Sequence, residues 1–134
     1  MSGRWNNDFG SRPRLLLAYA DPAYASDCGR YFRRLGWEVQ MVASGAEARQ
    51  LASEYQPNVV ALDAELLDES GWLTSAKIST ENPDLGIILV TDEETESTPH
   101  RLHMVGATQS VRRADGAEAL GHAVLGSAVL SYAI

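Results

Sequence analysis

Residues 58–71, NVVALDAELLDESG, decide the fold of this chain. Four apolar residues, 59–62, predict a short buried strand that ends at a carboxylate, Asp63. Further acids and Gly71 follow before apolar residues resume at Trp72. In open α/β sheets, ligands bind in the crevice beyond the carboxyl ends of the strands. Asp63 is therefore either a functional carboxylate or a residue that only caps a turn, and the rest of the chain must distinguish these two interpretations.

The composition predicts one acidic globular domain. The chain has 134 residues, of which 45% are hydrophobic, and its formal net charge is −7. This charge argues against a nucleic-acid surface, which requires clustered Lys and Arg. The single cysteine, Cys28, cannot form an internal disulfide and fits a reducing compartment. No secretory signal or membrane span is visible. We expect a cytoplasmic protein with a mobile leader, residues 1–13, and a single domain, residues 14–134.

Apolar segments of strand length alternate along the chain with segments of helical periodicity. Strands are expected at residues 14–20, 37–42, 59–62, 86–90 and 108–112. Helices are expected at residues 22–35, 45–56, 72–80, 100–105 and 116–134. Asp21 and the capping boxes that begin at Ser44 and Asp115 mark three of the helix starts. Near-continuous apolar strands joined by helices predict a parallel sheet covered on both faces.

Polar residues follow the expected strands at one edge of this sheet. They are Asp21 after the first strand, Asp63 after the third, Thr91 and Asp92 after the fourth, and Arg113 after the fifth. A carboxylate can accept a phosphoryl group as a nucleophile. A hydroxyl and a cation can then bind the added oxygens, and Mg²⁺ usually bridges carboxylates to phosphate.

With these residues the sequence resembles the receiver domains of two-component response regulators. The resemblance covers about residues 14–130 and rests on three segments: PNVVALDAELLDESGW, which contains Asp63 and Gly71, IILVT, which ends at Thr91, and VGATQSVRR, which ends at Arg113. It implies a flavodoxin-like, five-stranded parallel sheet in the order 2-1-3-4-5, with helices on both faces. It also implies Asp63 as phosphoacceptor, Thr91 as switch hydroxyl and Arg113 as the cation that pairs with the phosphoryl group.

The function that the resemblance implies is signalling and not enzyme catalysis. We expect a stand-alone module of a phosphorelay that receives its phosphoryl group from a histidine kinase or a phosphotransfer protein. The residues also leave an alternative. An ion pair between Asp63 and Arg113 could lock one conformation without phosphate. The chain would then be a phosphorylation-independent pseudo-receiver that acts as a protein-binding or dimerisation module.

The metal site departs from the family pattern. The acid pair that ends the first strand in receiver domains is replaced here by Tyr19 and Ala20, and the family's fifth-strand Lys is replaced by Arg113. A weak Mg²⁺ site is therefore expected. Its candidate ligands are Asp63, Asp21 and the backbone of Glu65.

The last expected helix has an unusual composition. Residues 119–134 contain no Asp, Glu, Lys or Arg. Leu125, Val129 and Tyr132 should point away from the sheet, and apolar residues all round a helix predict a covered outer face. In receiver domains the fourth helix, fifth strand and fifth helix form the usual partner surface. We therefore expect a protein partner or a homodimer on this face.

Overall fold

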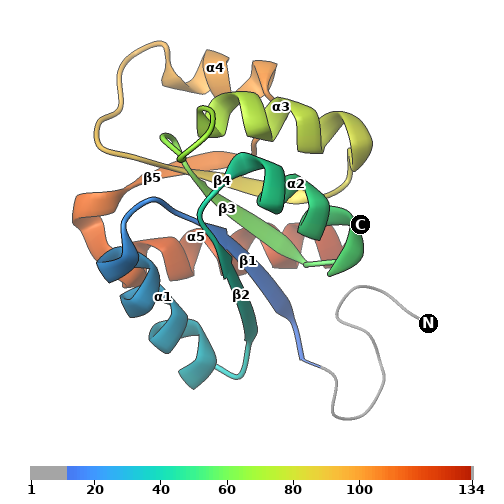
Figure 1. Cartoon of the computed structure of the whole chain (residues 1–134), viewed down its shortest axis with the longest axis vertical. Helices are drawn as coiled ribbons and strands as arrows, with labels where there is room; N and C mark the ends of the chain where they lie inside the picture. The colour runs from blue at the N-terminus through green and yellow to red at the C-terminus, as the bar shows by residue number, and fades with distance from the viewer. Residues whose placement is uncertain (1–11, 134) are drawn as a thin grey trace.

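Parallel strands form the middle layer of the molecule (Figure 1). The computed structural model describes residues 12–133, and the side chains of residues 12–127. The strands lie in the order β2-β1-β3-β4-β5, as the resemblance to receiver domains implies. Their bounds are β1 (Arg14–Ala18), β2 (Glu38–Val42), β3 (Val59–Asp63), β4 (Gly86–Thr91) and β5 (Gln109–Arg112).

Helices cover both faces of the sheet. Helices α1 and α5 lie on one face, and α2, α3 and α4 lie on the other (Figure 1). None of the described helices has the length and hydropathy needed to span a bilayer. Their bounds are α1 (Pro22–Arg34), α2 (Gly45–Glu54), α3 (Gly71–Glu81), α4 (Thr98–Met104) and α5 (Gly116–Ala133), with a 3-10 turn, η1 (Arg113–Asp115), before the last.

Two apolar clusters fill the space between sheet and helices. Every residue of β3 and β4 is buried, because both strands are covered on both faces. This double burial explains why their sequences are continuous apolar runs and do not alternate. The cluster beneath α1 and α5 includes Leu17, Tyr19, Tyr24, Cys28, Phe32, Ile88, Val90, Leu120 and Val124. The cluster beneath α2, α3 and α4 includes Leu16, Ala48, Val60, Leu62, Ile78, Ile87 and Leu89.

Local capping explains where two helices begin, and one predicted cap is wrong. The Asp21 carboxylate accepts a hydrogen bond from the Ala23 N–H at 3.0 Å, which starts α1. The Ser44 hydroxyl accepts from the Glu47 N–H at 3.1 Å, which starts α2. The predicted capping box at Asp115 does not form, because Asp115 lies in η1 and its carboxylate pairs with Arg112 at 3.3 Å.

Candidate functional site

Strand register brings the predicted site residues together at the carboxyl edge of the sheet. Asp63 is the last residue of β3 and lies opposite Val90 of β4. The next residue of β4, Thr91, lies opposite the last residue of β5. Arg113 follows directly in η1. The parallel sheet therefore places Asp63, Thr91 and Arg113 on neighbouring strand ends, as the sequence predicts.

The centre of the site is a two-point ion pair. The Nη1 atom of Arg113 lies 2.7 Å from Oδ2 of Asp63, and its Nη2 atom lies 3.0 Å from Oδ1. Asp63 is only 1% exposed, and its Oδ1 also accepts from the Glu65 N–H at 3.0 Å. Charge-assisted bonds of this forked kind are among the strongest polar contacts in proteins. Both carboxylate oxygens of Asp63 are therefore already bonded.

Arg113 is held from two further sides. Its Nε donates to Oδ1 of Asp92 at 2.9 Å, and its guanidinium carbon lies 5.7 Å from the centre of the Tyr24 ring. The hydrogen bonds to Asp63, followed by those to Asp92, raise the pKa of Arg113. The guanidinium thus uses three nitrogens on two carboxylates, a geometry that a lysine ammonium could not reproduce.

Thr91 is placed beside this pair and engaged elsewhere. The residue is 5% exposed. Its hydroxyl donates to the main-chain oxygen of Val111 at 3.5 Å, which is a long and weak hydrogen bond. The hydroxyl that the sequence assigns to a phosphoryl oxygen therefore contacts β5 in this structure.

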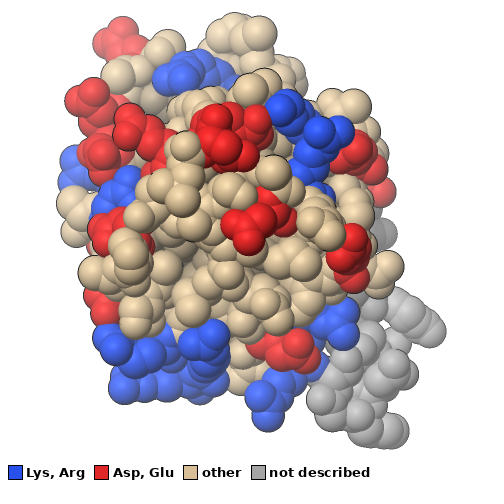
Figure 2. Space-filling view, viewed as in Figure 1, with Lys and Arg blue, Asp and Glu red and all other residues tan. Residues whose placement is uncertain are grey.

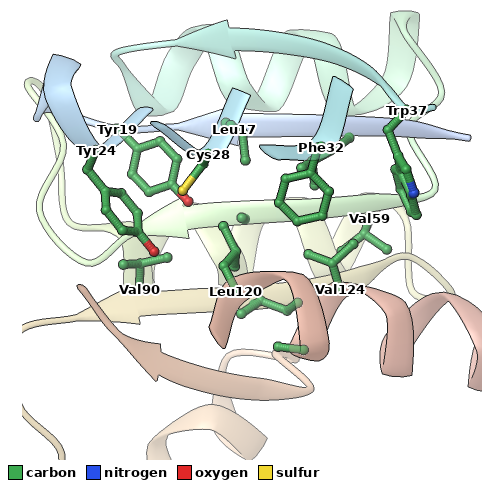
Figure 3. Packing of buried hydrophobic residues seen from close by; sticks show 14 residues of the cluster. Leu17, Tyr19, Tyr24, Cys28, Phe32, Trp37, Val59, Val90, Leu120 and Val124 are labelled. Atoms are coloured by element: carbon green, nitrogen blue, oxygen red, sulfur yellow. The ribbon is translucent and has the colours of Figure 1, made fainter. Parts of the chain in front are cut away.

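Tyr19 and Ala20 provide no metal ligand at the end of β1. The Tyr19 ring is buried and meets the Tyr24 ring edge-on, with 5.0 Å between ring centres (Figure 3). Burial raises the pKa of the Tyr19 phenol well above its ordinary value, so the phenol is neutral in the physiological range. Ala20 is exposed and has no donor atom. The contact between the Tyr19 and Tyr24 rings therefore stands after β1, where receiver domains have their acid pair.

The donor set does not fit Mg²⁺, which binds one or two free carboxylates with octahedral geometry. Arg113 holds both oxygens of Asp63, and the Asp21 carboxylate is bonded to the first N–H groups of α1. The main-chain oxygen of Glu65 accepts no hydrogen bond within the described residues, but it is a single neutral ligand. Within residues 12–133, no group of three or more His, Cys, Asp or Glu could hold a metal ion. Both candidate carboxylates, Asp63 and Asp21, are therefore engaged in protein contacts, which leaves one neutral main-chain oxygen as a candidate ligand.

The loop between β3 and α3 contains a contact that sequence reasoning missed. The Asp68 carboxylate accepts from the Gly45 N–H at 2.6 Å and from the Ala46 N–H at 3.0 Å, at the start of α2. These bonds lower the pKa of Asp68. A side chain at Gly71 would overlap the main-chain oxygen of Asp63. The loop under the site is therefore fixed both to α2 and to β3.

The loop after β4 is tied to the other side of the site. Besides the bond between Asp92 and Arg113, Glu94 hydrogen-bonds the hydroxyl of Ser110 on β5. The sequence contains no pattern that predicts this hydrogen bond, because Glu94 and Ser110 lie in separate segments. Both carboxylates restrain this loop against β5 and η1.

The predicted interface residues lie on α5. Leu125 is 36% exposed, which agrees with an outward position. The side chains of Val129 and Tyr132 lie outside the described part of the chain, as does most of the predicted leader, residues 1–11. The outer face of α5 therefore has one described apolar residue, and the interface stays a prediction.

Comparison with known proteins identifies related chains. Residues 15–124 match the family of the response regulator receiver domain. The protein named "Probable transcriptional regulatory protein TcrX" of Mycobacterium tuberculosis is 31% identical over 85 residues, which are 63% of this chain and 36% of TcrX. TorR, which regulates the TorCAD operon of Escherichia coli, is 30% identical over 58% of this chain and 33% of its own length. This chain thus spans about a third of the length of these relatives.

Solved structures share the fold. A CheY-like receiver domain protein from Methanospirillum hungatei superposes with a TM-score of 0.83 at 19% identity, over 90% of this chain and 97% of the other. The non-phosphorylated HemR receiver domain from Leptospira biflexa gives a TM-score of 0.79 at 19% identity, over 87% and 94%. At these identities the likeness concerns the fold alone.

Proposed function

Because this chain belongs to the response regulator receiver family, we propose that it is a signalling module whose site is closed by Arg113 and works without phosphorylation. Receiver domains are signalling domains that interact with histidine kinases or phosphotransfer proteins and typically bind Mg²⁺ at the phosphorylation site. One observation carries the proposal: Arg113 binds both oxygens of Asp63, in a site whose acid pair is replaced by Tyr19 and Ala20.

The cost of opening the pair supports this proposal. A phosphoryl donor needs a free oxygen on Asp63, so Arg113 must release at least one charge-assisted hydrogen bond. Each such bond contributes about 1.5–3 kcal/mol. In an ordinary receiver domain a divalent cation would offset that loss, but the donor set here does not fit one. Asp92 adds a further negative charge beside the pair, which opposes the approach of a phosphoryl anion.

The chain would then signal through a partner-binding surface that does not change with phosphorylation. We infer that α4, β5 and α5 contact a protein partner or a second copy of the chain. Exposed Leu125 and the absence of charged residues from 119 to 134 support this inference. Light scattering tests the homodimer: a mass that doubles with concentration in the wild type, and not in Leu125→Asp, is expected. A monomer throughout the concentration series leaves only a different protein as partner.

A phosphorelay receiver is the second candidate, and the placement of three residues favours it. Asp63 ends β3, Thr91 ends β4 beside it, and Gly71 leaves room for the loop that passes under Asp63. In this candidate, Asp63 accepts the phosphoryl group, Thr91 turns to bind an oxygen of it and Arg113 pairs with it. Arg113 would first have to leave the position that it holds in the present structure.

Phosphorylation by a small donor separates the two candidates. The wild-type chain and Asp63→Asn are incubated with acetyl phosphate and millimolar Mg²⁺, and their intact masses are measured. A receiver domain that retains its acid pair serves as the positive control. We expect no phosphoryl adduct on the wild type. An adduct on the wild type that is absent from Asp63→Asn would establish the phosphorelay and refute the closed site.

A further inference from the structure

Most described cations of this acidic protein have an acidic partner, and two that have none, Arg33 and Arg34, are neighbours in the last turn of α1. Arg12, Arg33 and Arg34 form no ion pair and lie over no aromatic ring among the described residues. Each other described cation has an acidic or aromatic partner: Arg14 with Glu38, Arg30 with Asp27, Arg49 with Glu81, Lys77 with Glu69, Arg112 with Asp115, Arg113 with Asp63 and Asp92, and Arg101 with the Trp72 ring. With a net charge of −7, acids are in excess, so unpaired arginines in one region are unexpected.

The arginines at the end of α1 form an exposed basic surface. Arg30, Arg33 and Arg34 are spaced at i, i+3 and i+4, which places them on one side of the helix. Figure 2 shows a dense group of basic side chains at the lower left, where Figure 1 places the end of α1. Arg33 and Arg34, in the last helical turn, also interact favourably with the helix dipole. That effect explains why they are tolerated there, but it leaves their charge available to a ligand.

This surface lies beside an open strand edge. β2 is the first strand of the sheet and, among the residues that the structure describes, pairs only with β1. The Glu38 N–H donates to Pro13 and the Val42 carbonyl accepts from Tyr19, so these residues point their backbone groups at β1. Because direction alternates along a strand, the N–H and C=O groups of Val39 and Met41 point outward. Within the described chain, the only hydrogen bond found on this edge is a weak one of 3.4 Å, from Arg33 to the Val39 oxygen.

The open edge has one charged side chain, Glu38 at its start, and its pairing with β1 contains no bulge. Natural edge strands often contain Pro, Lys or a bulge that prevents further pairing. β2 reads EVQMV and contains neither Pro nor Lys. Met41 is 41% exposed beside α1, and Leu35, just after α1, is 49% exposed. The edge therefore offers backbone hydrogen bonds, apolar contacts and arginines next to one another.

We propose that the free edge of β2 binds an extended acidic segment of a partner protein by strand addition. Backbone groups of the segment would pair with Val39 and Met41, and its carboxylates would pair with Arg33 and Arg34. An added strand lies about 4.8 Å from β2, which is within reach of the guanidinium that now contacts the Val39 oxygen. The charge of Arg33 and Arg34 favours an acidic partner, because its carboxylates would gain ion pairs that a neutral strand cannot form and a basic strand would be repelled. This surface is independent of Asp63 and its ion pair.

A pair of peptides tests whether the segment binds as a strand. Fluorescein-labelled octapeptides of alternating Glu and Val, and of alternating Glu and Pro, carry the same charge, but the second lacks half of the backbone N–H groups. Binding to the full chain is followed by fluorescence anisotropy. The Glu-Val peptide should bind about tenfold more tightly or better, and its affinity should fall as salt is added. Equal affinity for both peptides would overturn strand addition.

Two pairs of variants locate the binding. Arg33→Glu/Arg34→Glu should lose about tenfold or more in affinity for the Glu-Val peptide, while Arg49→Glu on α2 should bind as the wild type does. Met41→Pro removes an outward N–H without touching the β1 ladder, whereas Met41→Thr keeps it. Met41→Pro should lose binding and Met41→Thr should retain it, with circular dichroism confirming that each variant folds.

Failure at either position refutes the proposal. Unchanged binding in Arg33→Glu/Arg34→Glu would show that the two arginines do not contact the peptide. Equal binding by the two Met41 variants would show that the peptide does not pair with the edge of β2. Light scattering of the chain without peptide should give the same mass for the wild type and for Met41→Pro. A dimer lost in Met41→Pro would show that the edge is occupied by a second copy and would overturn the acidic partner.

Discussion

Replacing Arg113 by Met is expected to cost more stability than replacing Asp63 by Asn, although both changes break the same ion pair. In Arg113→Met the carboxylate of Asp63 stays 1% exposed, with a single hydrogen bond from the Glu65 N–H. In Asp63→Asn the guanidinium keeps Asp92 at 2.9 Å, and its side chain is 22% exposed. The two variants therefore leave very different charges behind.

The structure sets the expected magnitudes. A buried charge that loses its partner costs about 3–5 kcal/mol, which we expect for Arg113→Met. In Asp63→Asn the amide oxygen can keep one of the two hydrogen bonds from Arg113, so the change removes one charge-assisted contact from a partly solvated cation and should cost about 1–2 kcal/mol. The double variant should be about 2 kcal/mol more stable than the sum of the two single effects predicts. Asp92→Asn should cost at most about 1 kcal/mol, because that carboxylate is 76% exposed.

Urea unfolding followed by tryptophan fluorescence measures these free energies. Trp37 is 3% exposed and lies in the cluster under α1, so its emission reports loss of the core. The slope of unfolding free energy against urea must stay constant for the comparison to hold. If Arg113→Met cost no more than Asp63→Asn, or if the coupling fell below about 0.5 kcal/mol, the pair would not be the closed contact described above.

Three further outcomes are expected from other parts of the chain. In urea unfolding, Gly71→Ala should destabilise the fold by about 3 kcal/mol, because the added Cβ would overlap main-chain atoms of β3. Gly126→Ala lies on an open part of α5 and should stabilise the fold by about 0.5–1 kcal/mol. Burial raises the pKa of Cys28 from 9.0 to about 11, so its thiol ionises more readily in the unfolded chain. The stability due to this shift is present below pH 9.0 and is lost as the pH rises towards 11. In urea unfolding at a series of pH values, Cys28→Ala should lose less stability over this range than the wild type does. Millimolar Mg²⁺ should leave the melting temperature of the wild type and of Ala20→Asp unchanged. It should raise the melting temperature of Ala20→Asp/Arg113→Ala, in which the carboxylate introduced at position 20 and that of Asp63 are both free to bind the ion.

The sequence predicted the fold because its strongest signals are local. Buried strands such as β3 and β4 are continuous apolar runs, and Asp21 and Ser44 mark helix starts within a few residues. The convergence of Asp63, Thr91 and Arg113 followed from one topological rule about parallel strands. The ion pair between Asp63 and Arg113 was therefore among the alternatives that the sequence offered.

Contacts between distant segments could not be predicted in the same way. The Asp68 carboxylate binds an N–H that is 23 residues away, and Ser110 pairs with Glu94 across 16 residues. Both depend on how two loops approach each other in space, which periodicity does not encode. The capping box expected at Asp115 failed for a local reason, since Arg112, three residues earlier, competes for the same carboxylate.

The bond between Asp68 and the start of α2 gives this site a natural spectroscopic reporter. The Gly45 and Ala46 amides donate to a carboxylate on the loop that follows Asp63, so their exchange with deuterium requires that loop to leave α2. The exchange rate of these two amides therefore measures how often the loop opens. A ligand that loosens the loop would speed their exchange, and one that tightens it would slow it, without any label at the site itself.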